Sequence, residues 1–328
     1  MKKFLEGSRA VAEIIKLCRP GVISAYPITP QTHIVEELAQ MVANGEIDSQ
    51  FVNVESEHSA ASVVLGAVAT GVRAYTASSS QGLILMSEVL FNIAGMRLPL
   101  VLTCVNRALS APINIWNDQQ DSMAVRDSGW LQFYAEDIQQ AVDLHMLGYR
   151  ISEDANIMLP VMVCIDGYIL SHGIETVDVP EIEMVKKFLP DYKALYKLDP
   201  EKPLTFGCLA DPDYYMETRY AIQETHKEST ALINKRAEEF NKLFSRATCG
   251  LIEGYKTDDA TDVIIALGSV CGTIKDVVDE LRTTGQKVGL LKIVVYRPFP
   301  AEEIYAALKH VERIAVIDKA ISLGGWGP

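Results

Sequence analysis

The chain has 328 residues, of which 48% are hydrophobic and 22% charged, and its formal net charge is −13 at pH 7. This composition is typical of a folded globular protein that is long enough for two domains of ordinary size. The negative charge and the lack of a basic run argue against a surface for nucleic acid or for an anionic membrane. Glu6 and Arg9 interrupt the segment where a signal peptide needs apolar residues, and no apolar run reaches roughly 18 residues, so we expect a cytoplasmic protein.

The first part of the chain alternates short apolar runs with longer helical patterns. The runs predict strands over 21–27, 51–55, 72–78, 98–106 and 159–166, and the patterns predict helices near 31–43, 57–70, 82–95 and 137–151. The strands are apolar throughout rather than alternating, which is typical of a parallel sheet covered on both faces. We therefore expect a doubly wound α/β domain over residues 1–190.

The pattern changes after Asp191. A proline-spaced stretch and a long charged helix predict a linker with a surface helix over 191–250, whose charge is best interpreted as a solvated face. A second, smaller α/β domain follows over 251–328, with strands predicted over 262–269, 287–296 and 313–318 and helices over 273–284 and 301–309. Because another helix and strand would be expected after Pro328, we expect this domain to be incomplete here.

The cysteines and histidines predict no metal site on this chain. The six cysteines lie far apart and form no CxxC, so an iron–sulfur cluster or structural zinc held by this chain alone is not expected. No metal-ligand spacing relates His33, His145, His172, His226 and His310. His58 is kept as a candidate because it stands next to Glu57.

Polar loops follow four of the predicted strands, and in an open parallel sheet ligands bind beyond the carboxyl ends of the strands. The candidate residues in these loops are Pro27 and Thr29, then Glu55 and Glu57, then Ser80, Gln81 and Gly82, then Arg107 and Asn114. Two of them have a plainer interpretation. Thr29 can be a turn hydroxyl, and Arg107 can be the ion-pair partner of Asp118, Asp121 or Asp127. No GxGxxG or GxxxxGK[ST] is present, so a nucleotide phosphate cradle is not predicted.

Several motifs in order along nearly the whole chain carry a family resemblance. They are "YPITP", "VNVESEHSA", "SSQGL", "VNRALSAPINIWNDQQD", "LGSVCGT", "LLKIVVYRPFP" and "IDKAIS". Together they resemble the alpha subunit of the 2-oxoacid:ferredoxin oxidoreductases, with the pyruvate and branched-chain enzymes as the nearest members. The resemblance implies a thiamine-diphosphate-binding domain of the pyrimidine type, followed by a transketolase C-terminal-like domain.

The resemblance also implies a shared cofactor site. The resemblance assigns to this chain the domain that holds the aminopyrimidine of thiamine diphosphate. The lack of a GDG with a downstream Asn agrees with a beta subunit that would hold the diphosphate and Mg²⁺. The 4Fe-4S clusters would lie on ferredoxin-like gamma and delta subunits. Ferredoxin and coenzyme A complete the expected partners, and the assembly would be a dimer of heteromers.

Residue roles follow from the same resemblance. In thiamine enzymes one glutamate hydrogen-bonds N1′ of the pyrimidine and a glycine follows about nine residues later, a spacing that Glu57 and Gly66 fit and that Glu55 does not. A glutamate desolvated beneath an apolar run can share a proton with N1′. The resemblance assigns catalytic roles to Glu57, Arg107 and Thr29, cofactor contacts to Glu57, Pro27, Ser80, Gln81 and Gly82, and substrate contacts to Thr29, Arg107 and Asn114.

The expected reaction is oxidative decarboxylation of a 2-oxoacid, with pyruvate favoured, to acyl-CoA and CO₂, with electrons passed to ferredoxin. The segment "WNDQQD" after "APINI" keeps branched-chain and aryl 2-oxoacids open, since many pyruvate enzymes have a histidine-containing segment there. Three rivals remain: a transketolase-like or dehydrogenase E1-type subunit without ferredoxin, a non-catalytic structural subunit, and a stand-alone Rossmann nucleotide binder, which the missing glycine fingerprint disfavours.

Overall fold

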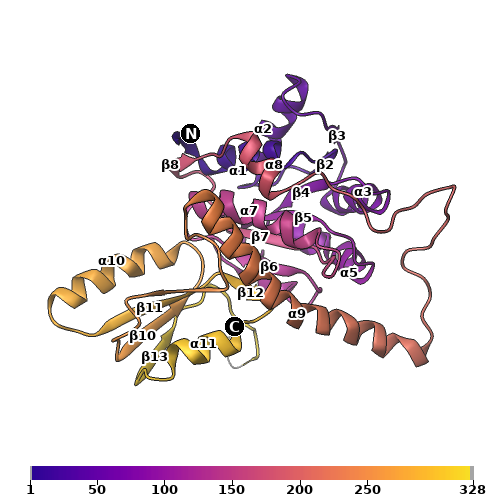
Figure 1. Cartoon of the computed structure of the whole chain (residues 1–328). Coiled ribbons are helices and arrows are strands. Elements are labelled where there is room, and N and C mark those ends of the chain that lie inside the picture. Colours follow the sequence, from indigo (N-terminus) through magenta and orange to yellow (C-terminus); the bar gives the residue numbers. More distant parts are fainter. Residues whose placement is uncertain (1, 326–328) are drawn as a thin grey trace.

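The computed structural model describes residues 2–325; the predicted truncation at Pro328 lies outside them. A seven-stranded sheet has the order β12-β6-β7-β5-β4-β2-β3 (Figure 1). Its strands are β2 (Val22–Ser24), β3 (Gln50–Val52), β4 (Ala74–Ser78), β5 (Val101–Asn106), β6 (Leu131–Tyr134), β7 (Val161–Asp166) and β12 (Val295–Arg297). All neighbours are parallel except β12, which is antiparallel to β6.

Helices cover both faces of this sheet. One apolar core includes residues of α1 (Gly7–Cys18), α2 (Thr32–Ala43), α7 (Ile138–Ser152) and α8 (Ile182–Phe188). The other includes residues of α3 (Glu57–Ala69), α4 (Ser80–Leu85), α5 (Ser87–Gly95) and α6 (Gln120–Ala124). Every residue of β4, β5 and β7 is buried. The fully apolar strands therefore predicted the doubly wound α/β fold correctly.

A second sheet has the order β13-β10-β11-β9, with β9 antiparallel to β11 and the other pairs parallel. Its elements are β9 (Ile252–Tyr255), β10 (Asp262–Ala266), β11 (Val288–Ile293) and β13 (Arg313–Val316), with the helices α10 (Val270–Thr283) and α11 (Ala301–Leu308). The prediction of one strand over 287–296 is wrong. The chain leaves the second sheet after Ile293 and joins the first as β12, because Tyr134 N–H donates to the Val294 carbonyl.

The charged helix is α9 (Pro212–Phe244), which spans 33 residues. Most of its charged side chains are exposed, while Ile233 and Phe240 are fully buried in the core beside α7. The helix is thus a surface helix with one packed face. Among residues 2–325, no helix combines the length and the hydropathy required to cross a membrane.

The sequence did not predict two strands that lie far apart in the chain. β1 (Lys2–Glu6) pairs antiparallel with β8 (Ile174–Asp178) in a separate two-stranded sheet. Each strand has five residues, and their pairing depends on a contact between distant segments. A run this short shows too little alternation of apolar and polar residues to predict a strand.

A buried carboxylate joins β7 to the second α/β unit. Asp166 is 1% exposed, and its Oδ2 accepts hydrogen bonds from the Ser269 N–H at 2.9 Å and from Lys319 Nζ at 2.9 Å, while Oδ1 accepts from Gln119 Nε2 at 3.0 Å. Burial alone would raise the pKa of Asp166, but the charge of Lys319 and these hydrogen bonds hold the pKa below its ordinary value. The ionised carboxylate is therefore the form that joins the two units.

We expect Asp166→Ala to lower the free energy of unfolding at neutral pH by about 3 kcal/mol, because it leaves Lys319 without its buried partner. A lowered pKa in the folded chain means that the stabilisation is present above the unfolded pKa of about 3.9 and is lost as the pH falls through the folded pKa. Urea unfolding at neutral pH and near pH 3 would measure this. Asp258→Ala, at an exposed position of the second unit, is the control; an equal loss for both variants at neutral pH would contradict the prediction.

Candidate active site at the carboxyl edge of the sheet

The loops that carry the candidate residues meet where the strand order reverses. The chain runs from β2 outward to β3 and then returns to place β4 on the other side of β2. The loops after β2 and β4 diverge at this point, which is where open α/β sheets bind ligands. The predicted gathering of these loops at one edge is confirmed.

Glu57 is the first residue of α3 and lies inward. Its N-cap Ser56 accepts a hydrogen bond from the Ser59 N–H at 3.1 Å, which fixes the start of the helix at this residue. Glu57 is 8% exposed, and a Cβ built on Gly82 would lie 2.6 Å from its Oε1 and 2.7 Å from Ser78 Oγ. Glycine at position 82 thus allows the Glu57 carboxylate to pass over the first turn of α4.

The neighbouring glutamate lies in a different environment. Glu55 is exposed and accepts a hydrogen bond from Ser59 Oγ at 2.5 Å, which lowers its pKa. His58 is half-buried, and its backbone carbonyl accepts from Ser62 Oγ. Of these three side chains, Glu57 is the one packed against the first turn of α4.

Gly66 does not pack closely within this chain. It lies on the exposed side of α3, and a Cβ built there would meet nothing within 4 Å. The spacing that singled out Glu57 thus has no packing contact at Gly66 behind it among the described residues.

The polar atoms around Glu57 lack partners. Within residues 2–325 its carboxylate accepts no hydrogen bond, and the buried hydroxyls Ser78 Oγ and Ser79 Oγ have no partner either. Buried polar groups are normally paired, so a cluster of unpaired ones marks a place where a ligand or another chain supplies the partners. A carboxylate acceptor beside two hydroxyls suits a nitrogen heterocycle that carries N–H or amino groups.

Arg107 connects the loops after β2 and β5. The side chain is 7% exposed, its Nη1 donates to the Thr29 carbonyl at 2.9 Å, and its Nε approaches the Asn114 carbonyl at 3.4 Å. The structure thus brings together Arg107, Thr29 and Asn114. Thr29 and Asn114 are exposed, as is Pro27 on the same loop as Thr29.

The first turn of α4 is held against the end of β5. Ser80 has a left-handed backbone with φ of +48°, and its Oγ lies 2.5 Å from the Ala108 carbonyl and 2.6 Å from Gln81 Oε1. This contact ties the first turn of α4, which contains Gly82, to the segment that follows β5. The two loops therefore form one structural unit.

Asp121 holds the first turn of α4 and the loop after β5 together. It is fully buried; Oδ2 accepts from the Ser80 N–H at 2.9 Å and the Arg107 N–H at 3.0 Å, and Oδ1 accepts from Asn106 Nδ2 and the Ser122 N–H, both at 2.8 Å. Burial raises the pKa of Asp121 to about 6, and the four hydrogen bonds oppose that rise. The ionised form with all four donors satisfied therefore prevails at pH 7.

Sequence reasoning considered Asp121 only as an ion-pair partner of Arg107, together with Asp118 and Asp127. In the structure Asp121 accepts the backbone N–H of Arg107, Asp118 accepts from the Gln120 N–H, and Asp127 pairs with Arg297. No carboxylate among residues 2–325 pairs with the Arg107 guanidinium. That side chain is therefore held by carbonyl groups and keeps its charge available.

We expect Asp121→Asn to lower the free energy of unfolding by about 3 kcal/mol or more. An amide nitrogen in place of one carboxylate oxygen faces two N–H donors and leaves them unsatisfied. Hydrogen exchange should become faster at the Ser80 and Arg107 amides. Asp118→Asn, which keeps the acceptor for the Gln120 N–H, is the matched control; unchanged exchange in Asp121→Asn would show that these bonds do not hold the loops.

Similarity to known proteins identifies the family of the chain. The family model described as "Pyruvate flavodoxin/ferredoxin oxidoreductase, thiamine diP-bdg" matches residues 13–238, and that described as "Pyruvate:ferredoxin oxidoreductase core domain II" matches residues 260–328. The chain is 51% identical to pyruvate synthase subunit PorA of Methanothermobacter thermautotrophicus, over 98% of this chain and 85% of that protein. It is 45% identical to ketoisovalerate oxidoreductase subunit VorA of Pyrococcus horikoshii, over 100% of this chain and 83% of that protein.

The fold is also found in a solved structure. A 2-oxoglutarate:ferredoxin oxidoreductase from Magnetococcus marinus superimposes with a TM-score of 0.73 at 21% identity, over 96% of this chain and 57% of that chain. At this identity the likeness concerns the fold. The matched models and the relatives together place the chain: it belongs to the pyruvate flavodoxin/ferredoxin oxidoreductase family of thiamine-diphosphate-binding proteins.

Proposed function

We propose that this chain is the alpha subunit of a pyruvate:ferredoxin oxidoreductase that converts pyruvate and coenzyme A to acetyl-CoA and CO₂. The observation that carries the proposal is the buried Glu57 side chain, which lies over Gly82 and has no hydrogen-bond partner among residues 2–325. Membership of a thiamine-diphosphate-binding family supports the aminopyrimidine of that cofactor as the group that would complete this site. The unpaired Ser78 and Ser79 hydroxyls fit such a ring.

Glu57 would hold the proton that activates the cofactor. Thiamine diphosphate, when bound, supplies the nucleophilic carbon that attacks the 2-oxo group. Because the Glu57 carboxylate accepts no hydrogen bond within residues 2–325, it can accept one from a protonated pyrimidine nitrogen. Glu55 is exposed and already bonded to Ser59, so it is not suited to this role.

Arg107 would bind the substrate carboxylate. Its Nη1 donates to the Thr29 carbonyl and its Nε approaches the Asn114 carbonyl, while its Nη2 makes no hydrogen bond within residues 2–325, so Nη2 remains available for a carboxylate. Thr29 and Asn114 thus engage the two nitrogens beside it. Orientation of the carboxylate out of the carbonyl plane before CO₂ leaves requires such a fixed cation, and Asp121 acts as a positioning residue because it anchors the Arg107 backbone.

Partner chains would complete the enzyme. We propose a beta subunit that binds the diphosphate and Mg²⁺, ferredoxin-like gamma and delta subunits that carry 4Fe-4S clusters, and a cytoplasmic dimer of heteromers that reduces ferredoxin. Support comes from the relatives, which are named as subunits. The VorA relative keeps a branched-chain substrate as the second candidate; faster turnover of 2-oxoisovalerate than of pyruvate would favour it.

We expect Glu57→Gln to lower the rate of coenzyme A-dependent viologen reduction with pyruvate by about 100-fold or more, because an amide cannot share the proton as a carboxylate does. The assay uses the complete complex, purified without oxygen. Glu55→Gln is the matched control and should keep the rate within about twofold. An unchanged rate in Glu57→Gln, with thiamine diphosphate bound, would instead favour a non-catalytic structural subunit.

We expect Gly82→Ala to weaken thiamine diphosphate binding by about tenfold or more, since its Cβ would displace Glu57 or Ser78 at a cost of about 1–3 kcal/mol. Equilibrium dialysis of the complex measures the affinity. Gly95→Ala, whose Cβ would meet nothing within 4 Å, is the control. Equal thiamine diphosphate affinity in the two variants would show that Gly82 is not part of the cofactor site.

A further inference from the structure

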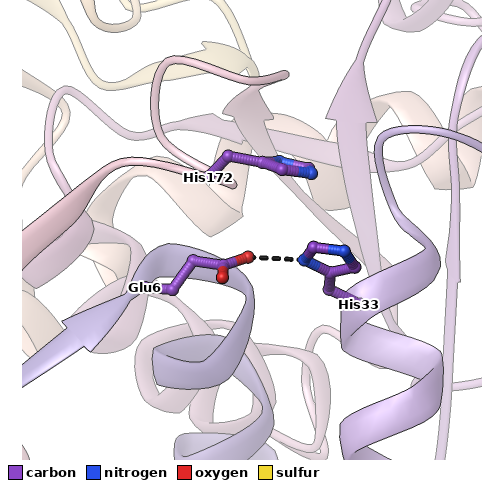
Figure 2. A group of neighbouring side chains, drawn as sticks. All are labelled: Glu6, His33 and His172. Carbon is purple, nitrogen blue, oxygen red and sulfur yellow. Dashed lines mark hydrogen bonds and ion pairs between the residues drawn. The ribbon is translucent and has the colours of Figure 1, made fainter.

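A group of metal-ligating side chains lies outside the candidate active site. Glu6 at the junction of β1 and α1, His33 in the first turn of α2, and His172 in the turn before β8 point toward one another (Figure 2). Their ligating atoms all lie within 4.8 Å of one another, and His33 Nδ1 is 2.7 Å from Glu6 Oε1. These residues are far apart in sequence, which explains why their spacing predicted no metal site.

From this geometry we propose that Glu6, His33 and His172 bind a Zn²⁺ ion. Two imidazoles and one carboxylate are a ligand set that zinc accepts, with water in the fourth position. Zinc–ligand bonds of about 2.0–2.2 Å place tetrahedral ligand atoms about 3.4 Å apart. Glu6 Oε1 and His33 Nδ1, which lie 2.7 Å apart, therefore need to separate slightly, while a pair at the 4.8 Å limit of the group closes by roughly 1 Å. The Glu6 and His33 side chains are 33% and 46% exposed and are free to make that movement.

The backbone segments that carry Glu6 and His172 are hydrogen-bonded to each other before the ion binds. The Gly7 N–H donates to the Gly173 carbonyl at 3.0 Å, and the Ser8 N–H donates to the Ser171 carbonyl at 2.9 Å. These bonds flank Glu6 on one segment and His172 on the other. Less conformational freedom is therefore lost when the ion binds.

The surroundings favour a cation. A cavity of about 390 Å³ lined by Glu6, His33, Glu36 and Glu37 gives a solvated path to the ligands. Arg9 also lines it, but its guanidinium is paired with Glu37 and Glu13. The remaining carboxylates leave the cavity with negative charge.

Zinc would tie the N-terminus of α2 to a row of aromatic rings. His172 lies 4.6 Å from His33 and 4.7 Å from Tyr168, measured between ring centroids, and Tyr168 lies 4.7 Å from Trp116 in the loop after Arg107. Binding would replace the hydrogen bond between Glu6 and His33 with bonds to the ion, without redox change. The site stands independently of the proposed function.

The test is the zinc content of the complete complex after dialysis against micromolar Zn²⁺, with iron content as the internal reference. All proteins carry Cys208→Ser, which removes an exposed thiol that would bind zinc by itself. In the parent protein we expect dialysis against Zn²⁺ to add one zinc per copy of this chain. In His33→Gln, His172→Gln and Glu6→Gln we expect this zinc to be lost, because the affinity for zinc falls by more than about tenfold.

His310→Gln, in the second α/β unit, is the control and should keep the ion. Melting curves in the absence of zinc verify that each variant is folded. Equal zinc content in the parent and in folded His33→Gln and His172→Gln would overturn the proposal, as would the absence of saturable binding in the parent.

Discussion

The fully buried Asp121 carboxylate is the interaction on which the candidate site depends. Its two oxygens accept four hydrogen bonds, two of them from the backbone N–H groups of Ser80 and Arg107. These groups begin the loops after β4 and β5, so a single side chain sets the distance between the turn that contains Gly82 and the cationic Arg107 side chain. Loss of one partner of a buried charge is costly, which makes the arrangement stiff.

The rest of the site is built on that support. Gly82 leaves room for Glu57 beside the first turn of α4, and the N-cap of Ser56 starts α3 at the residue that turns inward. Among residues 2–325 the Glu57 carboxylate accepts no hydrogen bond, and Nη2 of Arg107 donates none. Unpaired polar groups weaken a folded chain by themselves, and under the proposed function a cofactor and partner subunits would satisfy them.

Much of the fold could be predicted because its signals, apolar runs and helical patterns, are local. Glu57 was selected instead by the family resemblance and by its spacing from Gly66, and its role stays a prediction. Other features depend on contacts over long separations. Asp121 is 41 residues from Ser80, so nothing near it distinguished it from Asp118 or Asp127. The division of the strand predicted over 287–296 likewise follows from pairing with another sheet, which an unbroken apolar run does not reveal.

The central claim is that Glu57 and the first turn of α4 bind the pyrimidine of a thiamine diphosphate whose site another chain completes. An experimental structure of the complete complex with thiamine diphosphate bound tests it most directly. The account predicts that a Glu57 carboxylate oxygen lies within about 3 Å of the pyrimidine N1′ and that the diphosphate is bound by the partner subunit. A pyrimidine ring bound elsewhere, or a contact made by Glu55 instead, would contradict it.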